Sequence, residues 1–389
     1  MGPDDAALAL TGRKVHPAAP GAGDLESAGL YDPHAADAPA RLALLEYLIA
    51  LGATVEEMAA TPPDELPGLA STLALWAGSE RLTIDEVAAR AGVDRALIVR
   101  VWRAAGFPEP SRDGDNRAFS TRDVELIEIF RAGSEFLGEE VTLQMLRVIG
   151  AAAARVADAS VSAFMVNIAP QALVQDPSGL ALARANTDSM ALVGSMTDGF
   201  DTLLRHHIER GYRPLNVIAS ATDVDLVLRS VGFADLVDST SWTQQLDLSA
   251  LARALSEFDA VASEIVVERG GRVVKLIGDE VMFVANTAGA AADIALALIE
   301  AFAAHDALPP VRAGIASGEV LTRDGDFSGA VVNLAARAVK MAAPSTLLVD
   351  GATRDALEGD AAYAFGAAAE QTLKGFAEPV RLTRVMRTR

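Results

Sequence analysis

The sequence has no cysteine, and acidic residues far outnumber basic ones. Without thiols there can be no disulfide bonds, thiolate metal ligands or cysteine nucleophile, which suits a reducing compartment such as the cytoplasm. The sequence contains 33 lysines and arginines and 53 aspartates and glutamates, so the net charge is -20. This charge opposes non-specific binding to nucleic acid. With 389 residues, about half of them apolar, the chain is long enough for two or three domains.

Long uninterrupted hydrophobic runs are also missing. Residues 143–169 form the most apolar stretch, but three charged residues interrupt it, and two interrupt residues 290–304. Both stretches are too polar for a convincing membrane span, and we predict that both are buried helices. The N-terminus lacks the basic and then apolar order of a signal peptide. We therefore expect a cytoplasmic protein without a membrane span.

The pattern of the chain predicts a tail, a helical domain, a linker and a second domain. Residues 1–38 are rich in small residues and proline, which predicts a disordered tail. Residues 39–210 have a helical pattern, with capping-box spacing at Thr54 and Thr83. Few β-branched alternations occur before residue 215, so we expect an all-helical N-terminal domain. Residues 211–222 are the predicted linker, and 223–389 form the second domain.

The second domain has a mixed pattern of strands and helices. The predicted elements, in chain order, are a strand at 224–236, a helix at 248–269, strands at 272–277 and 280–285, a helix at 290–305, and a strand at 311–321. A tight turn at Gly278-Asp279 joins the two central strands. This β-α-β-β-α-β order is the ferredoxin-like arrangement, and it predicts an α+β fold.

Two aspartates stand where a metal site would need them. Asp235 ends the first predicted strand, and Asp279 lies at the tip of the predicted hairpin. The β-α-β-β order allows that strand and the hairpin to lie side by side, so the two carboxylates can converge on a hard ion such as Mg²⁺. The alternative is that each carboxylate simply ends a strand or a turn without a partner.

Three motifs in this half carry a resemblance to a known family. They are Phe233-Ala-Asp-Leu-Val237, Lys275-Leu-Ile-Gly-Asp279, and Asp326-Phe-Ser-Gly-Ala-Val-Val-Asn-Leu-Ala-Ala-Arg337. Their order and spacing resemble the catalytic domain of class III nucleotidyl cyclases, from about residue 225 to 386. The resemblance implies an enzyme that makes a 3′,5′-cyclic nucleotide and pyrophosphate, by in-line attack of the ribose 3′-oxygen on the α-phosphorus.

The resemblance also implies a role for each matching residue. Asp235 and Asp279 match the ligands of two Mg²⁺ or Mn²⁺ ions. Asn333 matches the residue that orients the ribose, and Arg337 matches the arginine that stabilises the transition state. Lys374, in Leu373-Lys-Gly375, resembles a triphosphate-binding lysine in the loosest of these matches.

Lys275 and Asp326 match the pair that reads the purine in this family. The adenine edge offers a ring-nitrogen acceptor and an amino donor, which a lysine donor and a carboxylate acceptor complement. Guanylyl cyclases of the family usually have Glu and a small residue in these places. We therefore expect ATP to be the substrate, with a guanylyl or mixed-specificity cyclase as the alternative.

In such cyclases the site forms between two catalytic domains. Because this chain carries a full set of site residues, the resemblance implies a homodimer with two sites at the interface. Two positions depart from the family pattern. Asp238 replaces a glycine that lets the backbone approach the phosphates, and Ser328 replaces a common aromatic residue.

The N-terminal half resembles the regulatory region of the pH-sensing mycobacterial adenylyl cyclases. The matching segments are Leu42-Ala-Leu-Leu-Glu-Tyr-Leu-Ile-Ala-Leu-Gly52, Val55-Glu-Glu-Met58 and Thr83-Ile-Asp-Glu-Val87. The resemblance implies that this region holds the dimer together and switches the catalytic domains. Related regulatory domains are associated with fatty-acid binding, so a fatty-acid-like ligand is a further expectation.

Residues 82–131 also resemble the winged helix-turn-helix of MerR-type regulators. This similarity leaves open a DNA-binding regulator that uses a nucleotide-sensing pseudocyclase domain. Five arginines in or beside the segment are candidate phosphate contacts: Arg95, Arg100, Arg103, Arg112 and Arg117. Six neighbouring carboxylates roughly cancel their charge, so we do not expect DNA binding: Asp85, Glu86, Asp94, Glu109, Asp113 and Asp115.

A helix over residues 182–210 is predicted to connect the two halves. Its apolar residues at helical spacing form one stripe: Val193, Met196, Phe200, Leu203 and Leu204. His207 falls on this stripe, and His206 points about 100° away. We expect acidification to charge His207 and shift the helix, which is a candidate pH sensor. The alternative is an ordinary packing histidine.

Overall fold

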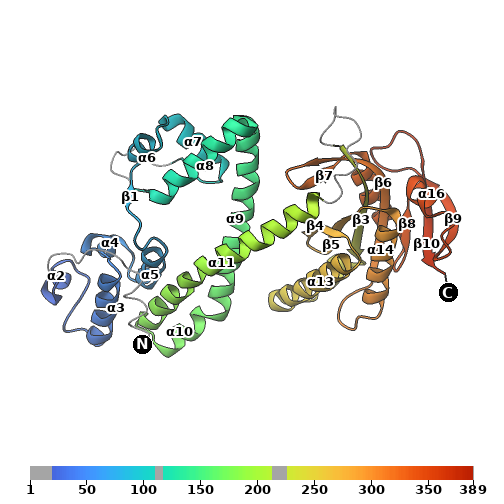
Figure 1. Cartoon of the computed structure of the whole chain (residues 1–389). Coiled ribbons are helices and arrows are strands. Elements are labelled where there is room, and N and C mark those ends of the chain that lie inside the picture. The colour runs from blue at the N-terminus through green and yellow to red at the C-terminus, as the bar shows by residue number, and fades with distance from the viewer. Residues whose placement is uncertain (1–19, 110–116, 213–225, 389) are drawn as a thin grey trace. The chain divides into compact units, whose positions relative to one another are not determined.

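A computed structural model describes residues 20–109, 117–212 and 226–388 (Figure 1). The chain divides into two compact units, residues 1–218 and 219–389, which are described separately. The predicted linker, residues 211–222, lies almost entirely outside the described residues.

The first part of the N-terminal unit is a small helical cluster. It contains α2 (Ala22–Ser27), α3 (Ala38–Ala50), α4 (Val55–Ala60) and α5 (Leu66–Leu75). The Thr54–Glu57 capping box opens α4, as its spacing predicts. The core is mostly leucine, with Leu44, Leu45 and Leu48 of α3 fully buried.

The prediction of a disordered tail over residues 1–38 is wrong for residues 20–38. This segment contains α2, and Leu25 and Leu30 are buried in the same core as α3. Two apolar side chains anchor the segment even though its composition is dominated by small residues and proline. Residues 1–19 lie outside the described part of the chain.

The second part is a helix-turn-helix with two very short strands. Its elements are β1 (Arg81–Leu82), α6 (Ile84–Ala91), α7 (Arg95–Ala104), β2 (Phe119–Ser120) and α8 (Thr121–Leu137). The Thr83–Glu86 capping box opens α6, and Gly92, at φ 66°, closes it. The antiparallel pair β1–β2 departs from the expected all-helical domain. Strands of two residues are too short to show an alternating pattern in a sequence.

Three further helices complete this unit: α9 (Glu139–Asn167), α10 (Ala169–Gln175) and α11 (Leu180–Tyr212). The prediction that residues 143–169 form a buried helix is wrong, because Leu146 is the one buried residue of α9. The stretch Glu139–Gln175 is long and apolar enough to cross a membrane by length and composition, and none of its most apolar window is buried within the chain. Its apolar surface is therefore available to a partner.

The C-terminal unit is built on a mixed sheet of eight strands. In chain order its elements are β3 (Leu226–Leu236), α12 (Ser239–Thr243), α13 (Leu248–Glu268), β4 (Arg272–Ile277), β5 (Glu280–Ala285), α14 (Ala288–Ala303), β6 (Val311–Arg323), β7 (Asp326–Ser328), α15 (Ala330–Met341), β8 (Leu347–Val349), α16 (Gly351–Leu357), β9 (Tyr363–Gln371) and β10 (Val380–Arg387). The strand order is β4-β5-β3-β6-β8-β10-β9, and β7 pairs with β6. The predicted ferredoxin-like order is confirmed, and β7 to β10 extend it.

The sheet separates two layers of helices. Side chains from α13, α14 and α16 pack on one face, where Phe258 and Phe302 are fully buried. On the other face α15 packs through Ala335 and Val339 against Val231 of β3. Successive residues of β3 therefore point into different cores.

Candidate active site

Strand alternation positions Asp235. Along β3, Val231 and Phe233 pack against α15, whereas Ala234 and Leu236 face the layer of α13 and α14. Asp235 belongs to the α15 side, because alternate side chains of a strand share a face. It is 3% exposed. A carboxylate this deeply buried requires a cationic partner or a metal.

Two cationic side chains of the same chain hold the Asp235 carboxylate. Arg312, opposite Asp235 in the β3–β6 register, donates from Nε at 3.0 Å and from Nη2 at 2.7 Å to Oδ2. Lys340 of α15 places Nζ 3.1 Å from Oδ1 of Asp235 and 2.8 Å from Oε2 of Glu280. Burial lowers the pKa of Lys340, but hydrogen bonds to Glu280 and Asp235 outweigh it and raise the pKa above its ordinary value. Both oxygens of Asp235 are thus engaged.

The β4–β5 hairpin brings Asp279 beside Asp235, as predicted. Gly278 adopts φ 65° in the turn, a conformation that glycine takes without strain. The carbonyl oxygen of Asp279 accepts a hydrogen bond of 3.0 Å from the backbone N–H of Leu236. In the antiparallel register of β3 and β5, Asp235 lies opposite Glu280, the residue that follows Asp279.

The donor set at this edge of the sheet fits a hard divalent ion. Mg²⁺ typically binds to one or two protein carboxylates and completes its shell with water and substrate phosphates. Asp235 and Asp279 provide two such carboxylates on adjoining backbone segments. Among the residues that the structure describes, no group of three or more His, Cys, Asp or Glu side chains is arranged as a metal site. The two aspartates would therefore supply part of the coordination shell of the ion, and water or substrate phosphates would complete it.

The predicted purine-reading pair meets in space. Lys275 of β4 donates from Nζ to Oδ2 of Asp326 of β7 at 2.6 Å, although 51 residues separate them. The backbone N–H of Phe327 donates to Oδ1 of Asp326 at 2.8 Å. Burial alone would raise the pKa of Asp326. The hydrogen bonds from Lys275 and Phe327 and the positive charges of Lys275 and Arg272 outweigh burial and bring the pKa below its ordinary value. Asp326 is therefore an ionised acceptor.

Helix α15 presents Asn333 and Arg337 on one exposed face. They stand four residues apart, and both side chains reach solvent in this chain. The buried face of α15 lies very close to β6, because Gly314 has no side chain. A Cβ atom there would lie 2.2 Å from the backbone nitrogen of Val339. Gly314 thus sets the depth at which α15 packs.

The structure brings the predicted site residues together only in part. The side chains of Lys275 and Asp326 are in contact. Asp235 and Asp279 lie on neighbouring backbone segments, and Asn333 and Arg337 share an exposed helix face. Lys374 is exposed in the loop between β9 and β10, and within the described residues it has no ion pair with any other predicted site residue. Its match to a triphosphate-binding lysine stays a prediction.

Sequence reasoning missed the cations around Asp235. Lys340 stands seven residues after Asn333, which places the two on one helix face, so this spacing could have identified it. Arg312 reaches Asp235 only through the pairing register of β3 and β6. No local pattern gives that register.

The two departures from the family pattern have different structural settings. Asp238 has φ 53°, a left-handed conformation that suits the glycine more common at this position. Ser328 ends β7, where it lies opposite Leu321 of β6, while the neighbouring Phe327 is buried.

Comparison with known proteins gives a consistent assignment for both units. The family described as "Adenylate cyclase regulatory domain" matches residues 24–206. The family described as "Adenylate and Guanylate cyclase catalytic domain" matches residues 225–386. An adenylate cyclase of Glutamicibacter nicotianae is 31% identical over 97% of this chain and 93% of its own length. The chain belongs to the adenylate cyclases.

Two other relatives extend over both units. An uncharacterised protein of Mycobacterium tuberculosis is 35% identical to this cyclase, over 92% of each chain. A protein of the same species named as a pH-sensitive adenylate cyclase is 29% identical, over 89% of this chain and 88% of its own. The resemblance of the N-terminal half to a cyclase regulatory region is confirmed.

Four of the five arginines that are candidate phosphate contacts pair with carboxylates in this cyclase. Arg95 lies 3.3 Å from Asp85, and Arg100 lies 2.8 Å from Glu139. Two further ion pairs join Arg103 to Glu109 and Arg117 to Glu86. Arg112 lies outside the described residues. These pairs weaken any phosphate-binding surface, because the four positive charges are matched within the chain.

In addition, α7 of the cyclase is a packing element. The backbone of Ala105, at its end, lies so close to α9 that a Cβ on Gly150 would come within 2.3 Å of the Ala105 carbonyl oxygen. The helix that would enter a DNA groove in a MerR-type regulator is thus packed against α9.

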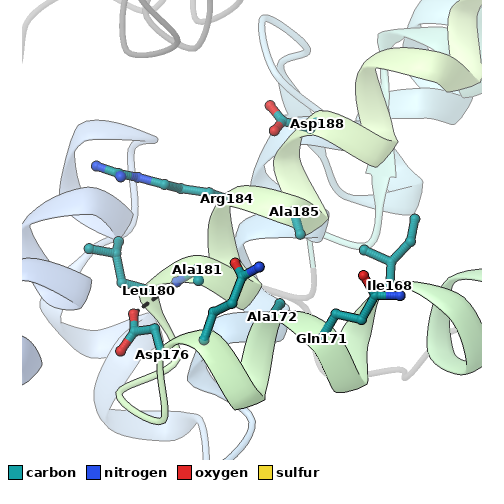
Figure 2. Close-up of a pocket in the computed structure, with 10 residues that line it drawn as sticks. Ile168, Gln171, Ala172, Asp176, Leu180, Ala181, Arg184, Ala185 and Asp188 are labelled. Carbon is teal, nitrogen blue, oxygen red and sulfur yellow. Dashed lines mark hydrogen bonds between the residues drawn. The ribbon is translucent and has the colours of Figure 1, made fainter.

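A pocket of about 370 Å³ lies between α10 and α11 of the regulatory unit (Figure 2). Apolar groups such as Ile168 and Leu180 line it together with Asp176, Arg184 and Asp188. Asp176 accepts a hydrogen bond of 3.1 Å from the backbone N–H of Ala181. With three charged residues among its lining, the pocket does not single out an apolar chain, and the fatty-acid-like ligand stays a prediction.

Proposed function

We propose that this cyclase converts ATP to 3′,5′-cyclic AMP and pyrophosphate in the cytoplasm, where ATP is available. The observation that carries the proposal is the 2.6 Å contact between Lys275 and Asp326. A lysine donor and a carboxylate acceptor at one point complement the adenine edge. The guanine edge presents an oxygen acceptor and an N–H donor, and in this family Glu and a small residue read it. The alternative of a guanylyl or mixed-specificity cyclase is therefore the weaker one.

The residues at the sheet edge have separate tasks in this reaction. Asp235 and Asp279 would hold two Mg²⁺ or Mn²⁺ ions, and these ions would supply charge neutralisation and acidify the ribose 3′-hydroxyl. Asn333 hydrogen-bonds the ribose and fixes the 3′-oxygen in line with the α-phosphorus. The guanidinium of Arg337 carries a permanent charge and donates to the phosphoryl oxygens as negative charge builds up there.

The active unit is a homodimer with two sites at its interface. Asn333 and Arg337 are exposed, and in the described part of the chain no carboxylate pairs with Arg337. The resemblance to class III cyclases implies that one chain supplies the aspartates and the other supplies Asn333 and Arg337. A two-fold dimer would bring the two sets together at both sites.

The regulatory unit makes the activity sensitive to pH. Support comes from the relative named as a pH-sensitive adenylate cyclase and from the stripe on α11. On that stripe Phe200, Leu203 and Leu204 are exposed, with fractions of 49%, 60% and 46%. A second copy covers this stripe in the dimer, so a charge on His207 there is costly. Acidification therefore shifts the packing of α11.

Product analysis tests the reaction. The purified chain is incubated with ATP or with GTP in the presence of Mn²⁺, and cyclic nucleotides are quantified by mass spectrometry. We expect cyclic AMP to predominate, and we expect Asp279→Ala to reduce its formation by roughly 100-fold or more. Equal formation of cyclic GMP, or full activity of Asp279→Ala, would contradict the proposal.

A further inference from the structure

Helix α15 carries a third charged or polar side chain in line with Asn333 and Arg337. Lys340 follows Asn333 by seven residues and Arg337 by three, so all three lie on one face. Ala335, Ala338 and Val339 are fully buried and fix the opposite face on the sheet. This packing directs Lys340 to the edge where β3 ends and β5 begins.

At that edge Lys340 contacts two carboxylates. Its Nζ lies 3.1 Å from Oδ1 of Asp235 and 2.8 Å from Oε2 of Glu280. The Asp235 side chain is only 4% exposed, so its interactions are weakly screened by water. Arg312 uses Oδ2 of the same carboxylate with two hydrogen bonds. A further cation that binds to Asp235 would therefore bind to Oδ1, the oxygen that Lys340 already contacts.

We propose that Lys340 competes with the divalent metal for Oδ1 of Asp235 and thereby sets the metal affinity of the cyclase. This inference rests on the proposed metal-binding role of Asp235. A divalent ion binds to a carboxylate oxygen at about 2.1 Å. An ammonium hydrogen-bonded to the same oxygen would then be a like charge within a few ångströms, so the two exclude each other.

Glu280 makes the exchange reversible. It faces Asp235 across the β3–β5 register, and its contact with Lys340 does not involve the Asp235 carboxylate. When the metal takes Oδ1, Lys340 keeps one carboxylate partner and stays beside the site. Arg312 cannot exchange partners in this way. It lies on β6 directly opposite Asp235 of β3, and both of its hydrogen bonds go to Oδ2 of Asp235.

Metal affinity of the full-length protein tests the competition directly. Binding of Mn²⁺ is followed without nucleotide by electron paramagnetic resonance of the free ion. We expect Lys340→Met to bind Mn²⁺ roughly 5- to 20-fold more tightly than the wild type, because an ion pair with a buried carboxylate no longer has to break. Lys340→Arg keeps the charge and should remain near the wild type. Unchanged or weaker binding by Lys340→Met would overturn the proposal.

Arg269→Gln is the matched control for the loss of one positive charge. Arg269 follows the C-terminal end of α13 and pairs with Glu268 at 2.8 Å. This substitution should change Mn²⁺ affinity by less than about twofold, because Arg269 has its own carboxylate partner and makes no contact with Asp235 among the described ion pairs. An equal gain in both variants would show a general charge effect and would also overturn the competition.

A measurement on the wild-type protein covers the case in which Lys340→Met does not fold. Lysine side chains are acetylated under limiting conditions, with and without Mg²⁺, and each site is quantified by mass spectrometry. Exposed Lys374 serves as the internal reference. Competition predicts that Mg²⁺ raises the modification of Lys340 relative to Lys374 about threefold or more. A ratio unchanged by saturating Mg²⁺ would overturn it.

Failure of this inference is distinguishable from failure of the proposed function. If the wild type makes cyclic AMP and Asp279→Ala does not, the proposed function holds whatever Lys340→Met does. If no variant binds Mn²⁺, the competition is excluded, and the product assay then decides the function by itself.

Discussion

Lys275 Nζ, on β4, lies 2.6 Å from Asp326 Oδ2, on β7. The two side chains are about half exposed, so their value for stability is small. Their contribution to the proposed recognition of adenine is geometric, because the contact fixes a donor and an acceptor at one point. Arg272 supports the arrangement from β4, since its guanidinium lies 5.0 Å over the ring of Phe327, the residue after Asp326.

Exchanging this pair should exchange the base preference. In Lys275→Glu/Asp326→Ser the donor is replaced by an acceptor, and the acceptor by a small side chain. We expect kcat/KM for ATP to fall roughly 100-fold and the ratio of GTP to ATP turnover to rise at least tenfold. Initial rates with both nucleotides measure this. A double variant that is folded and keeps the wild-type preference for ATP would show that other residues read the base.

Gly314 should be intolerant of any side chain. An added Cβ would meet backbone atoms, at 2.2 Å from the nitrogen of Val339 and 2.9 Å from the oxygen of Ala335. Neither can move without shifting α15, so we expect Gly314→Ala to lower the free energy of unfolding by about 3 kcal/mol and to reduce activity. Urea denaturation followed by circular dichroism measures the change.

Gly289→Ala provides the comparison. Gly289 lies in α14, and a Cβ there meets only the hydroxyl oxygen of Tyr363, at 3.7 Å, which is ordinary contact. Alanine is the better helix former by about 1 kcal/mol, so this variant should be as stable as the wild type or more so. Equal losses in the two variants would mean that the close approach of α15 to β6 is not what Gly314 provides.

Asp238→Gly should improve substrate binding. Asp238 combines a left-handed φ of 53° with a negative charge three residues after Asp235. Glycine relieves the backbone and removes the charge, so we expect KM for ATP to fall about threefold. Asp324→Gly is the matched control, because Asp324 has φ 58° and belongs to the turn between β6 and β7. Both changes should raise the unfolding free energy by about 0.5 kcal/mol, but only the first should change KM.

His207→Phe should flatten the pH dependence of activity. The substitution keeps an aromatic side chain on the α11 stripe and removes the proposed pH-sensing group. His206→Phe, on the neighbouring face, should leave the profile unchanged. Activity is measured between pH 5.5 and 8 for both variants and the wild type. If His207→Phe keeps the full pH response, the sensor lies elsewhere in the regulatory unit.

Much of the catalytic fold was predictable from the sequence because its signals are local. Strands 272–277 and 280–285, with a turn at Gly278-Asp279, agree with β4 and β5 residue for residue. A glycine that can adopt φ 65° between two β-branched runs is a strong hairpin signal. The side-by-side placement of the first strand and the hairpin follows from the β-α-β-β order and is confirmed, because β5 pairs with β3.

Features that depend on long-range packing were not predictable in the same way. The composition of an apolar helix predicts that it is buried, but it does not identify the surface that buries it. Residues 143–169 are mostly exposed within the chain. Residues 20–38 have a composition that predicts disorder, but buried Leu25 and Leu30 anchor this segment to the core that contains α3. Arg312 reaches Asp235 through the register of β3 and β6. Lys340 reaches Asp235 because α15 packs close to β6, and Gly314, a distant residue in the sequence, allows this close approach.

Complementation between two inactive variants tests the shared dimeric site most directly. Asp279→Ala removes a proposed metal ligand, and Arg337→Ala removes the proposed transition-state donor. If each site takes its aspartates from one chain and its Asn333 and Arg337 from the other, half of a randomly mixed population is mixed dimer, and each mixed dimer has one intact site. We expect each variant alone to be almost inactive and the re-equilibrated mixture to recover about a quarter of the wild-type cyclic AMP formation. A mixture as inactive as its components would contradict a site shared between two chains.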